Sequence, residues 1–135
     1  MQDKREPDHP VSRGRVLAVD DSPDMLLLVS SSLEAMGFDV EAVDSGLAAL
    51  EAFRDSRFDA VVLDVDMPGL DGLQVARALR ADPRSRRSAI AMHTSLEEVD
   101  VRARFDGYDA YLPKPCAPRE LGERLDLLIR AARRG

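Results

Sequence analysis

Short apolar runs that alternate with amphipathic stretches constrain the fold of this chain more than any other feature. Residues 16–19, 60–63 and 89–92 are continuous apolar runs, which are typical of strands covered on both faces. Residues 38–42 alternate between apolar and polar side chains, which predicts a strand nearer an edge of the sheet. A fifth short run occupies residues 110–112.

Helical periodicity fills the intervals between these runs. The first pattern has Ser22 as a predicted N-cap, Pro23 in the first turn and Gly37 as the stop. The later apolar stripes are Leu47, Leu50 and Phe53; Leu73, Ala76 and Leu79; Leu96, Val99 and Phe105; and Leu121, Leu125, Leu128 and Ala132. This order predicts a doubly wound (βα)5 α/β fold, in which right-handed crossovers place helices on both faces of a parallel sheet.

The length and composition describe one globular domain. A chain of 135 residues with 44% hydrophobic and 33% charged residues is long enough to bury a core and too apolar to be disordered. Residues 1–14 contain two prolines and no apolar period. We therefore expect a disordered leader at 1–14, followed by a single domain at 15–135.

Charge and residue usage argue against several classes of function. The net charge of −6 and the absence of tryptophan argue against direct nucleic-acid binding. No apolar run approaches the roughly 20 residues that cross a bilayer, so we expect no membrane span. The single cysteine excludes an intrachain disulfide framework and a cysteine-rich zinc site. The polar N-terminus lacks an apolar signal core, which predicts a cytoplasmic protein.

Polar side chains follow four of the five predicted strands. Asp20 and Asp21 follow the first strand, Asp64 the third, Thr94 the fourth and Lys114 the fifth. Ligands of open α/β sheets bind beyond the carboxyl ends of the strands, so we expect these residues to meet at one edge. Taken singly, each has a simpler interpretation as a helix cap, a turn residue or a solvated surface charge.

The predicted cluster has a charge that requires a cation. Three carboxylates within a few Å repel one another, and one of them would take up a proton unless a cation neutralised the group. Mg²⁺ fits best, because it binds one or two carboxylates together with water and phosphate oxygens. Lys114 is the one lysine outside the leader in a chain whose other basic residues there are arginines. Its compact ammonium group suits contact with a phosphoryl oxygen.

These residues resemble the receiver domain of two-component response regulators, and in particular the chemotaxis regulators. The resemblance covers about residues 15–133 and is carried by the acidic pair after the first strand, LDVDMPGLDG at 63–72, Thr94, and YLPKP at 111–115. It implies a flavodoxin-like fold with five parallel strands in the order 2-1-3-4-5. The short interval between Thr94 and YLPKP predicts a short loop or helix after the fourth strand.

The resemblance assigns the acidic residues to phosphoryl transfer. It implies that Asp64 is the phosphoacceptor and takes its phosphoryl group from a sensor histidine kinase or a phosphotransfer protein. It also implies that Asp20, Asp21 and Asp64 bind Mg²⁺ together with the backbone carbonyl of Asp66. Self-phosphorylation and autodephosphorylation at Asp64 are then the only reactions expected of the chain.

Three further residues receive roles from the same resemblance. Thr94 and Lys114 match the positions that bind phosphoryl oxygens, and Tyr111 matches the aromatic switch residue. The Lys114–Pro115 bond is expected to be cis, as in similar domains. The expected output is a downstream protein bound in trans by a stand-alone monomer or weak homodimer, with no direct contact to nucleic acid or membrane.

Two other functions remain open from the sequence. Asp64 and Asp66 at a strand end resemble the nucleophile motif of haloacid-dehalogenase-type phosphatases, although the acidic pair precedes that motif here and a cap has no room. A pseudo-receiver that binds partners without phosphorylation is the second alternative. It is weakened because the five key positions of a receiver are all present.

Overall fold

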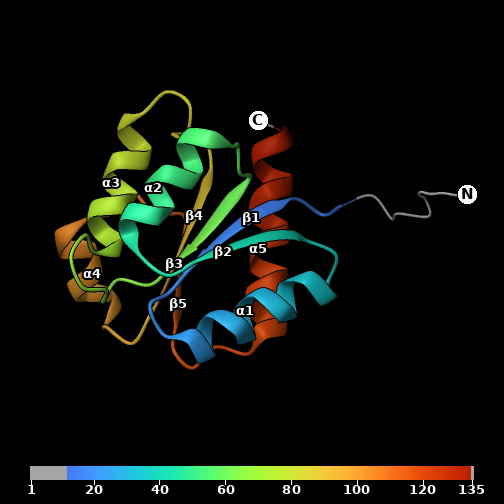
Figure 1. Cartoon of the computed structure of the whole chain (residues 1–135), viewed down its shortest axis with the longest axis horizontal. Helices are drawn as coiled ribbons and strands as arrows, with labels where there is room; N and C mark the ends of the chain where they lie inside the picture. The colour runs from blue at the N-terminus through green and yellow to red at the C-terminus, as the bar shows by residue number, and fades with distance from the viewer. Residues whose placement is uncertain (1–11, 135) are drawn as a thin grey trace, which may run out of the picture.

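Five parallel strands form one sheet in the order β2-β1-β3-β4-β5 (Figure 1). The computed structural model describes residues 12–134, so most of the predicted leader at 1–14 lies outside the described residues. The strands are β1 (Arg15–Val19), β2 (Asp39–Val43), β3 (Ala60–Leu63), β4 (Ala89–Thr94) and β5 (Ala110–Pro113). The prediction of a five-stranded parallel sheet with this strand order is confirmed.

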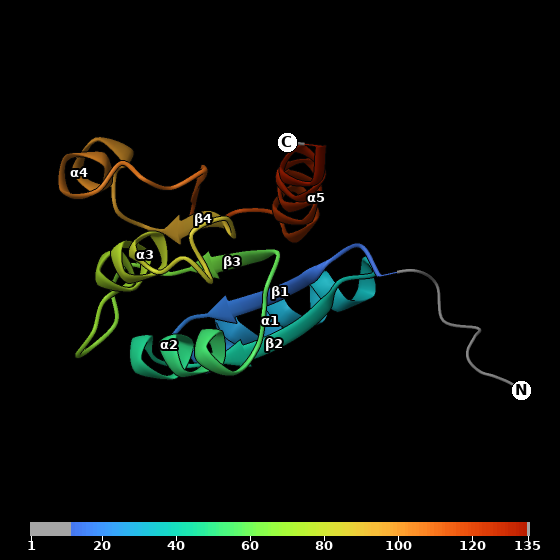
Figure 2. The same ribbon diagram turned by 90° about the horizontal axis from the view of Figure 1, so that it is seen from above.

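Four helices connect the strands, a fifth follows β5, and together they cover both faces of the sheet (Figure 2). They are α1 (Pro23–Ala35), α2 (Gly46–Asp55), α3 (Gly72–Ala81), α4 (Glu98–Arg104) and α5 (Pro118–Arg134). Buried side chains of α1 and α5 share one apolar cluster, and those of α2, α3 and α4 share the other. The doubly wound arrangement predicted from the sequence is therefore confirmed.

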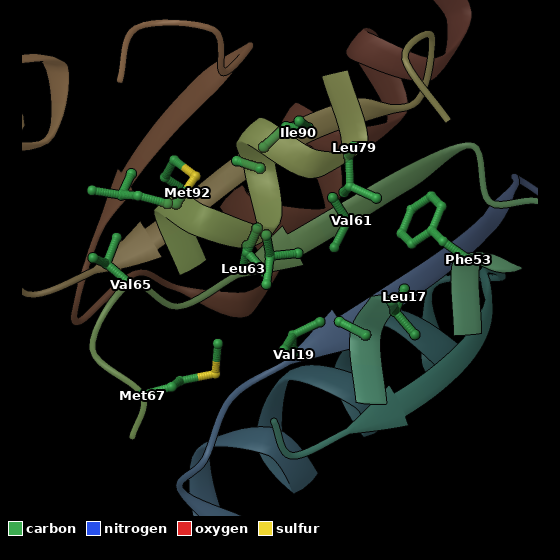
Figure 3. Close-up of a cluster of buried hydrophobic side chains, with 14 of the residues drawn as sticks. Leu17, Val19, Phe53, Val61, Leu63, Val65, Met67, Leu79, Ile90 and Met92 are labelled. Carbon is green, nitrogen blue, oxygen red and sulfur yellow. The ribbon is translucent and has the colours of Figure 1, made fainter. Parts of the chain in front are cut away.

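Residues along each central strand alternate between the two apolar clusters. Val61 and Leu63 of β3 pack with α2, α3 and α4, in the cluster that Figure 3 shows. Ala60 and Val62 of the same strand pack with α1 and α5. Both faces of β3 are buried, which explains why the strand is a continuous apolar run in the sequence.

The predicted helix boundaries at α1 agree with the structure. Ser22 is the N-cap of α1 and its side chain accepts a hydrogen bond from the Met25 N–H. Pro23 begins the helix, and Gly37 adopts a positive φ of 101° just beyond its C-cap, Met36. A glycine is favoured there because a Cβ makes this left-handed conformation costly.

The predicted apolar stripe of Leu96, Val99 and Phe105 is wrong at Val99, while Leu96 and Phe105 pack against the core. The structure begins the seven-residue helix at Glu98, so Leu96 lies before it. Val101 is completely buried, whereas Val99 is 72% exposed. Val99 and Val101 are two positions apart, which separates them by about 200° around the helix axis. Only one of these valines can therefore face the sheet. The expectation that this segment is short is confirmed.

Among residues 12–134, no helix combines the length and the apolar character that crossing a membrane requires.

Candidate functional site

The ends of β1 and β3 bring the predicted acidic residues together. Val19 and Leu63, the last residues of these strands, are partners in the parallel ladder, so Asp20 and Asp64 leave the sheet side by side. A carboxylate oxygen from each of Asp20, Asp21 and Asp64 lies within 4.8 Å of the others. The expected convergence at the carboxyl edge of the sheet is confirmed.

Lys114 joins this cluster from the far end of the chain. Its Nζ donates a 2.7 Å hydrogen bond to Asp20 Oδ2 and lies 3.4 Å from Asp64 Oδ2. Asp20 and Asp64 are only 4% and 6% exposed, whereas Asp21 is exposed to solvent. Asp20 also accepts a 2.9 Å hydrogen bond from the Ser22 N–H through Oδ1, which fixes the orientation of its carboxylate.

The electrostatics of the site leave negative charge uncompensated. Three carboxylates face one ammonium group. Burial raises the pKa of Asp64, and the neighbouring Asp20 raises it further, while Lys114 and the backbone N–H of Asp66 oppose the rise. A bound cation would oppose the same rise, because it favours the charged form of the carboxylate.

The donor set fits a small divalent cation. Mg²⁺ prefers oxygen ligands and binds through one or two carboxylates while keeping several waters. Exposed Asp21 leaves one side of the cluster open to water, and buried Asp20 and Asp64 form the other side. The predicted use of Asp66 concerns its backbone carbonyl and stays a prediction; its side chain is exposed.

Gly72 allows the loop that carries Asp64 to close against α3. A Cβ on Gly72 would lie 2.0 Å from the Asp64 carbonyl oxygen, far inside van der Waals contact. The Gly72 N–H donates a 3.0 Å hydrogen bond to the Val65 carbonyl, and this bond stabilises the close contact between the two backbone segments. Sequence reasoning assigned no role to this glycine; the only signal was its place in the segment at 63–72.

Leu96 links Thr94 to Tyr111 through two hydrogen bonds. The Thr94 hydroxyl oxygen accepts a 3.2 Å hydrogen bond from the Leu96 N–H. The Tyr111 hydroxyl donates to the Leu96 carbonyl. Thr94 is completely buried at the end of β4, and the next helix begins only at Glu98 with Glu97 as its N-cap. Thr94 is therefore not the cap of that helix.

Lys114 follows β5 directly, and this strand places it at the site. The Lys114 N–H donates a 2.9 Å hydrogen bond to the Thr94 carbonyl, which extends the β4–β5 pairing by one residue. The Lys114–Pro115 peptide bond is cis, as the resemblance to receiver domains predicted.

His93 is buried beside the charged cluster. It is 3% exposed, and its Nε2 has no hydrogen-bond partner within the described part of the chain. Burial lowers the pKa of His93 to about 4, and the positive charge of Lys114 contributes to the decrease, whereas Asp20 opposes it. The imidazole is therefore neutral at pH 7.

Comparison with known proteins identifies the family. The sequence profile of the response regulator receiver domain matches residues 16–126. The sensor protein GacS of Pseudomonas syringae pv. syringae is 42% identical over an alignment of 115 residues that covers 81% of this chain and 13% of GacS. The chain thus spans a small part of the length of this curated relative.

Solved structures give the same result. The receiver domain of a signal transduction histidine kinase from Syntrophus aciditrophicus is 30% identical, with a TM-score of 0.83 over 90% of this chain and 94% of that one. The response regulator TrrA of Thermotoga maritima, solved in complex with Mg²⁺–BeF, is 30% identical. Its TM-score is 0.77 over 84% of this chain and 97% of that one. None of these similarities supports the phosphatase or the pseudo-receiver alternative. The chain belongs to the response regulator receiver domains of two-component systems.

Proposed function

We propose that Asp64 accepts a phosphoryl group from a phosphohistidine on a sensor histidine kinase or a phosphotransfer protein. The observation that carries this proposal is the clustering of Asp64 with the carboxylates of Asp20 and Asp21 and with the ammonium group of Lys114. A nucleophile for phosphoryl transfer needs positioning and neutralised oxygens more than covalent help from the protein. The cluster supplies both.

The transfer is balanced without a further reactant. An Asp64 carboxylate oxygen forms a bond to phosphorus and the phosphorus–nitrogen bond of the donor breaks. The imidazole leaves as a neutral ring, which keeps the bonding pair on this nitrogen and the proton that its other nitrogen already carried. Mg²⁺, held by Asp20, Asp21, Asp64 and the carbonyl of Asp66, would neutralise the phosphoryl oxygens. Lys114 contributes a second positive charge, because its ammonium group lies 3.4 Å from Asp64. Attack by water on phosphorus then breaks the bond to the Asp64 oxygen, releases inorganic phosphate and restores the carboxylate.

The phosphoryl group would act on the rest of the domain through Thr94. Its hydroxyl accepts a hydrogen bond from Leu96 N–H, so the hydroxyl proton remains available for a phosphoryl oxygen. Movement of Thr94 toward that oxygen would pull on Leu96, whose carbonyl holds the Tyr111 hydroxyl. Thr94 and Tyr111 thus form a switch between the acidic site and the surface of β5.

The expected output of this switch is a downstream protein bound in trans. The domain would work as a monomer or weak homodimer in the cytoplasm, without direct contact to nucleic acid or membrane. Its only reactions would be self-phosphorylation and autodephosphorylation at Asp64. The net charge of −6 supports a protein partner over a nucleic acid.

Incubation with acetyl phosphate and Mg²⁺, followed by intact-mass measurement, tests the acceptor. We expect one added phosphoryl group in the wild type and none in Asp64→Asn. Asp66→Ala is the matched control, because it removes a nearby exposed carboxylate and keeps the backbone carbonyl. Labelling of Asp64→Asn at the wild-type level would contradict the assignment.

A further inference from the structure

His93 is a buried polar residue whose place in the sheet adjoins the acidic cluster. Leu63 and Met92 are partners in the β3–β4 ladder, so Asp64 and His93, which follow them, leave the two strands side by side. Ala91, two positions before His93, packs in the apolar cluster with α1 and α5. Because side chains alternate along a strand, the imidazole lies on that same face of the sheet.

Lys114 reaches the acidic cluster across the strand that carries His93. β4 lies between β3 and β5, and the Nζ of Lys114, which follows β5, lies 3.4 Å from Asp64, which follows β3. Leu112, two positions before Lys114, is the ladder partner of His93 and packs in the cluster with α1 and α5. The lysine side chain therefore extends over β4 at the level of His93. The charges of Lys114 and Asp20 both influence the pKa of His93, in opposite directions, which agrees with this placement.

The imidazole of His93 has a hydrogen-bonding atom that the described part of the chain does not use. The residue is 3% exposed, and its Nε2 has no partner among residues 12–134. A buried polar atom without a partner is costly, and most such atoms in folded proteins have one. Ala89 and Ala91 show that small apolar side chains suit this face of β4. We therefore looked for a partner that reaches Nε2 in another state of the site.

Lys114 has a reason to move when the site is occupied. Asp20 already uses both carboxylate oxygens, since Oδ1 accepts from the Ser22 N–H and Oδ2 accepts from Lys114. A cation at Asp20 repels the ammonium group, and phosphoryl oxygens on Asp64 attract it. Both effects draw Nζ away from β1, toward the part of the sheet where Asp64 and His93 are neighbours.

We propose that His93 is a positioning residue for Lys114. When Lys114 leaves Asp20 for a phosphoryl oxygen on Asp64, another N–H of its ammonium group donates to His93 Nε2. An ammonium group has three N–H donors, so it can bind an oxygen and a nitrogen together. The contact holds the positive charge over β4, beside the acyl phosphate, and Nδ1 carries the imidazole proton. This inference rests on the proposed function of Asp64 as the acceptor.

Nitrogen NMR of the full chain tests the contact directly. The chain has two histidines and two lysines, and His9 and Lys4, which precede β1, serve as internal controls. Protein labelled with 15N in both residue types is measured at neutral pH without ligand, with Mg²⁺, and with Mg²⁺ and beryllofluoride. We expect His93 Nε2 to resonate as an unprotonated nitrogen and to move upfield when beryllofluoride is added. Exchange of the Lys114 Nζ protons with water should slow in the same sample.

Two variants separate positioning from packing. His93→Leu fills the site without Nε2, whereas His93→Gln keeps a side-chain group that can accept from Lys114. With beryllofluoride bound, exchange of the Lys114 Nζ protons should be about tenfold faster in His93→Leu than in wild type. His93→Gln should restore slow exchange. A role in packing alone would leave this exchange rate the same in all three proteins.

The amide of Thr94 reports independently that beryllofluoride has bound. If Thr94 responds while Nε2 does not move, or if Nε2 carries a proton, His93 does not position Lys114 and the proposed acceptor stands. Equal Lys114 exchange in wild type and His93→Leu would lead to the same conclusion. If Thr94 does not respond in the wild type, the proposed function is wrong and this inference is wrong with it. The measurement on Nε2 needs no variant, so it decides the matter even if His93→Leu does not fold.

Discussion

Lys114 donates its shortest hydrogen bond to Asp20, at 2.7 Å, although the two residues are 94 positions apart in the chain. Its contact with Asp64 is longer, at 3.4 Å. The ammonium group is thus held by a residue of the proposed cation site and remains near the proposed acceptor. This arrangement makes Lys114 the part of the site that is most sensitive to side-chain shape.

We expect Lys114→Arg to fold and to bind Mg²⁺, but to couple phosphorylation poorly to Thr94 and Tyr111. The guanidinium group keeps the charge, yet its planar fork is bulkier than the ammonium group in a position where the lysine side chain is only 17% exposed. Amide spectra with and without a beryllofluoride mimic of the phosphoryl group would measure the coupling. Wild-type shifts around Thr94 and Tyr111 in the variant would show that the shape of lysine is not required.

Mg²⁺ should stabilise the folded protein through the acidic cluster. At a concentration about ten times its dissociation constant, a ligand of the native state contributes about 1.4 kcal/mol to the free energy of unfolding. Asp21→Ala should lose most of the corresponding increase in melting temperature. Glu123→Ala, which removes an exposed carboxylate on α5, is the control and should keep it. An unchanged Mg²⁺ effect in Asp21→Ala would remove that residue from the site.

Replacement of Gly72 by alanine should destabilise the fold and displace the acceptor loop. The new Cβ would meet the Asp64 carbonyl oxygen at 2.0 Å, and backbone atoms cannot yield as a flexible side chain can. We expect a loss of about 2–3 kcal/mol in the free energy of unfolding, measured with urea.

Gly69→Ala is the control for this loop. Gly69 has a φ of 77°, and a Cβ added there would meet no atom within 4 Å, so alanine should cost only about 1 kcal/mol through backbone strain. Equal losses for the two variants would mean that the close approach at Gly72 is not what holds the loop.

The free energy of unfolding should decrease as the pH is lowered from 6.5 to 4, because of His93. Its pKa is lowered to about 4 in the folded protein, so over this range the unfolded chain binds a proton that the folded chain does not. The free energy of unfolding therefore rises with pH across the interval, by about 3 kcal/mol for this group.

Comparison of wild type with His93→Leu isolates this contribution. Asp64, whose pKa is raised by burial, contributes with the opposite sign, since the unfolded chain releases that proton first as the pH increases. It is present in both proteins and cancels from their difference. Equal pH slopes in urea denaturation of the two proteins would contradict the prediction.

The sequence by itself determined the local elements and the chemistry at their ends. Residues 60–63 form a continuous apolar run because both faces of β3 are buried, and Ser22 caps α1 because its hydroxyl satisfies a free N–H. Asp64 follows β3 directly in the chain, so its place at the carboxyl edge followed from the strand assignment. These features depend on residues that are close together in the sequence, so the periodicity of apolar residues predicts them.

Only the tertiary structure decided which distant groups touch. The 2.7 Å contact between Lys114 and Asp20 depends on the order in which the strands pack, and the burial of Val101 in place of Val99 depends on where α4 begins over the sheet. Such contacts are selected by packing of the whole chain, and the periodicity of one segment carries no information about the side chains that another brings near it.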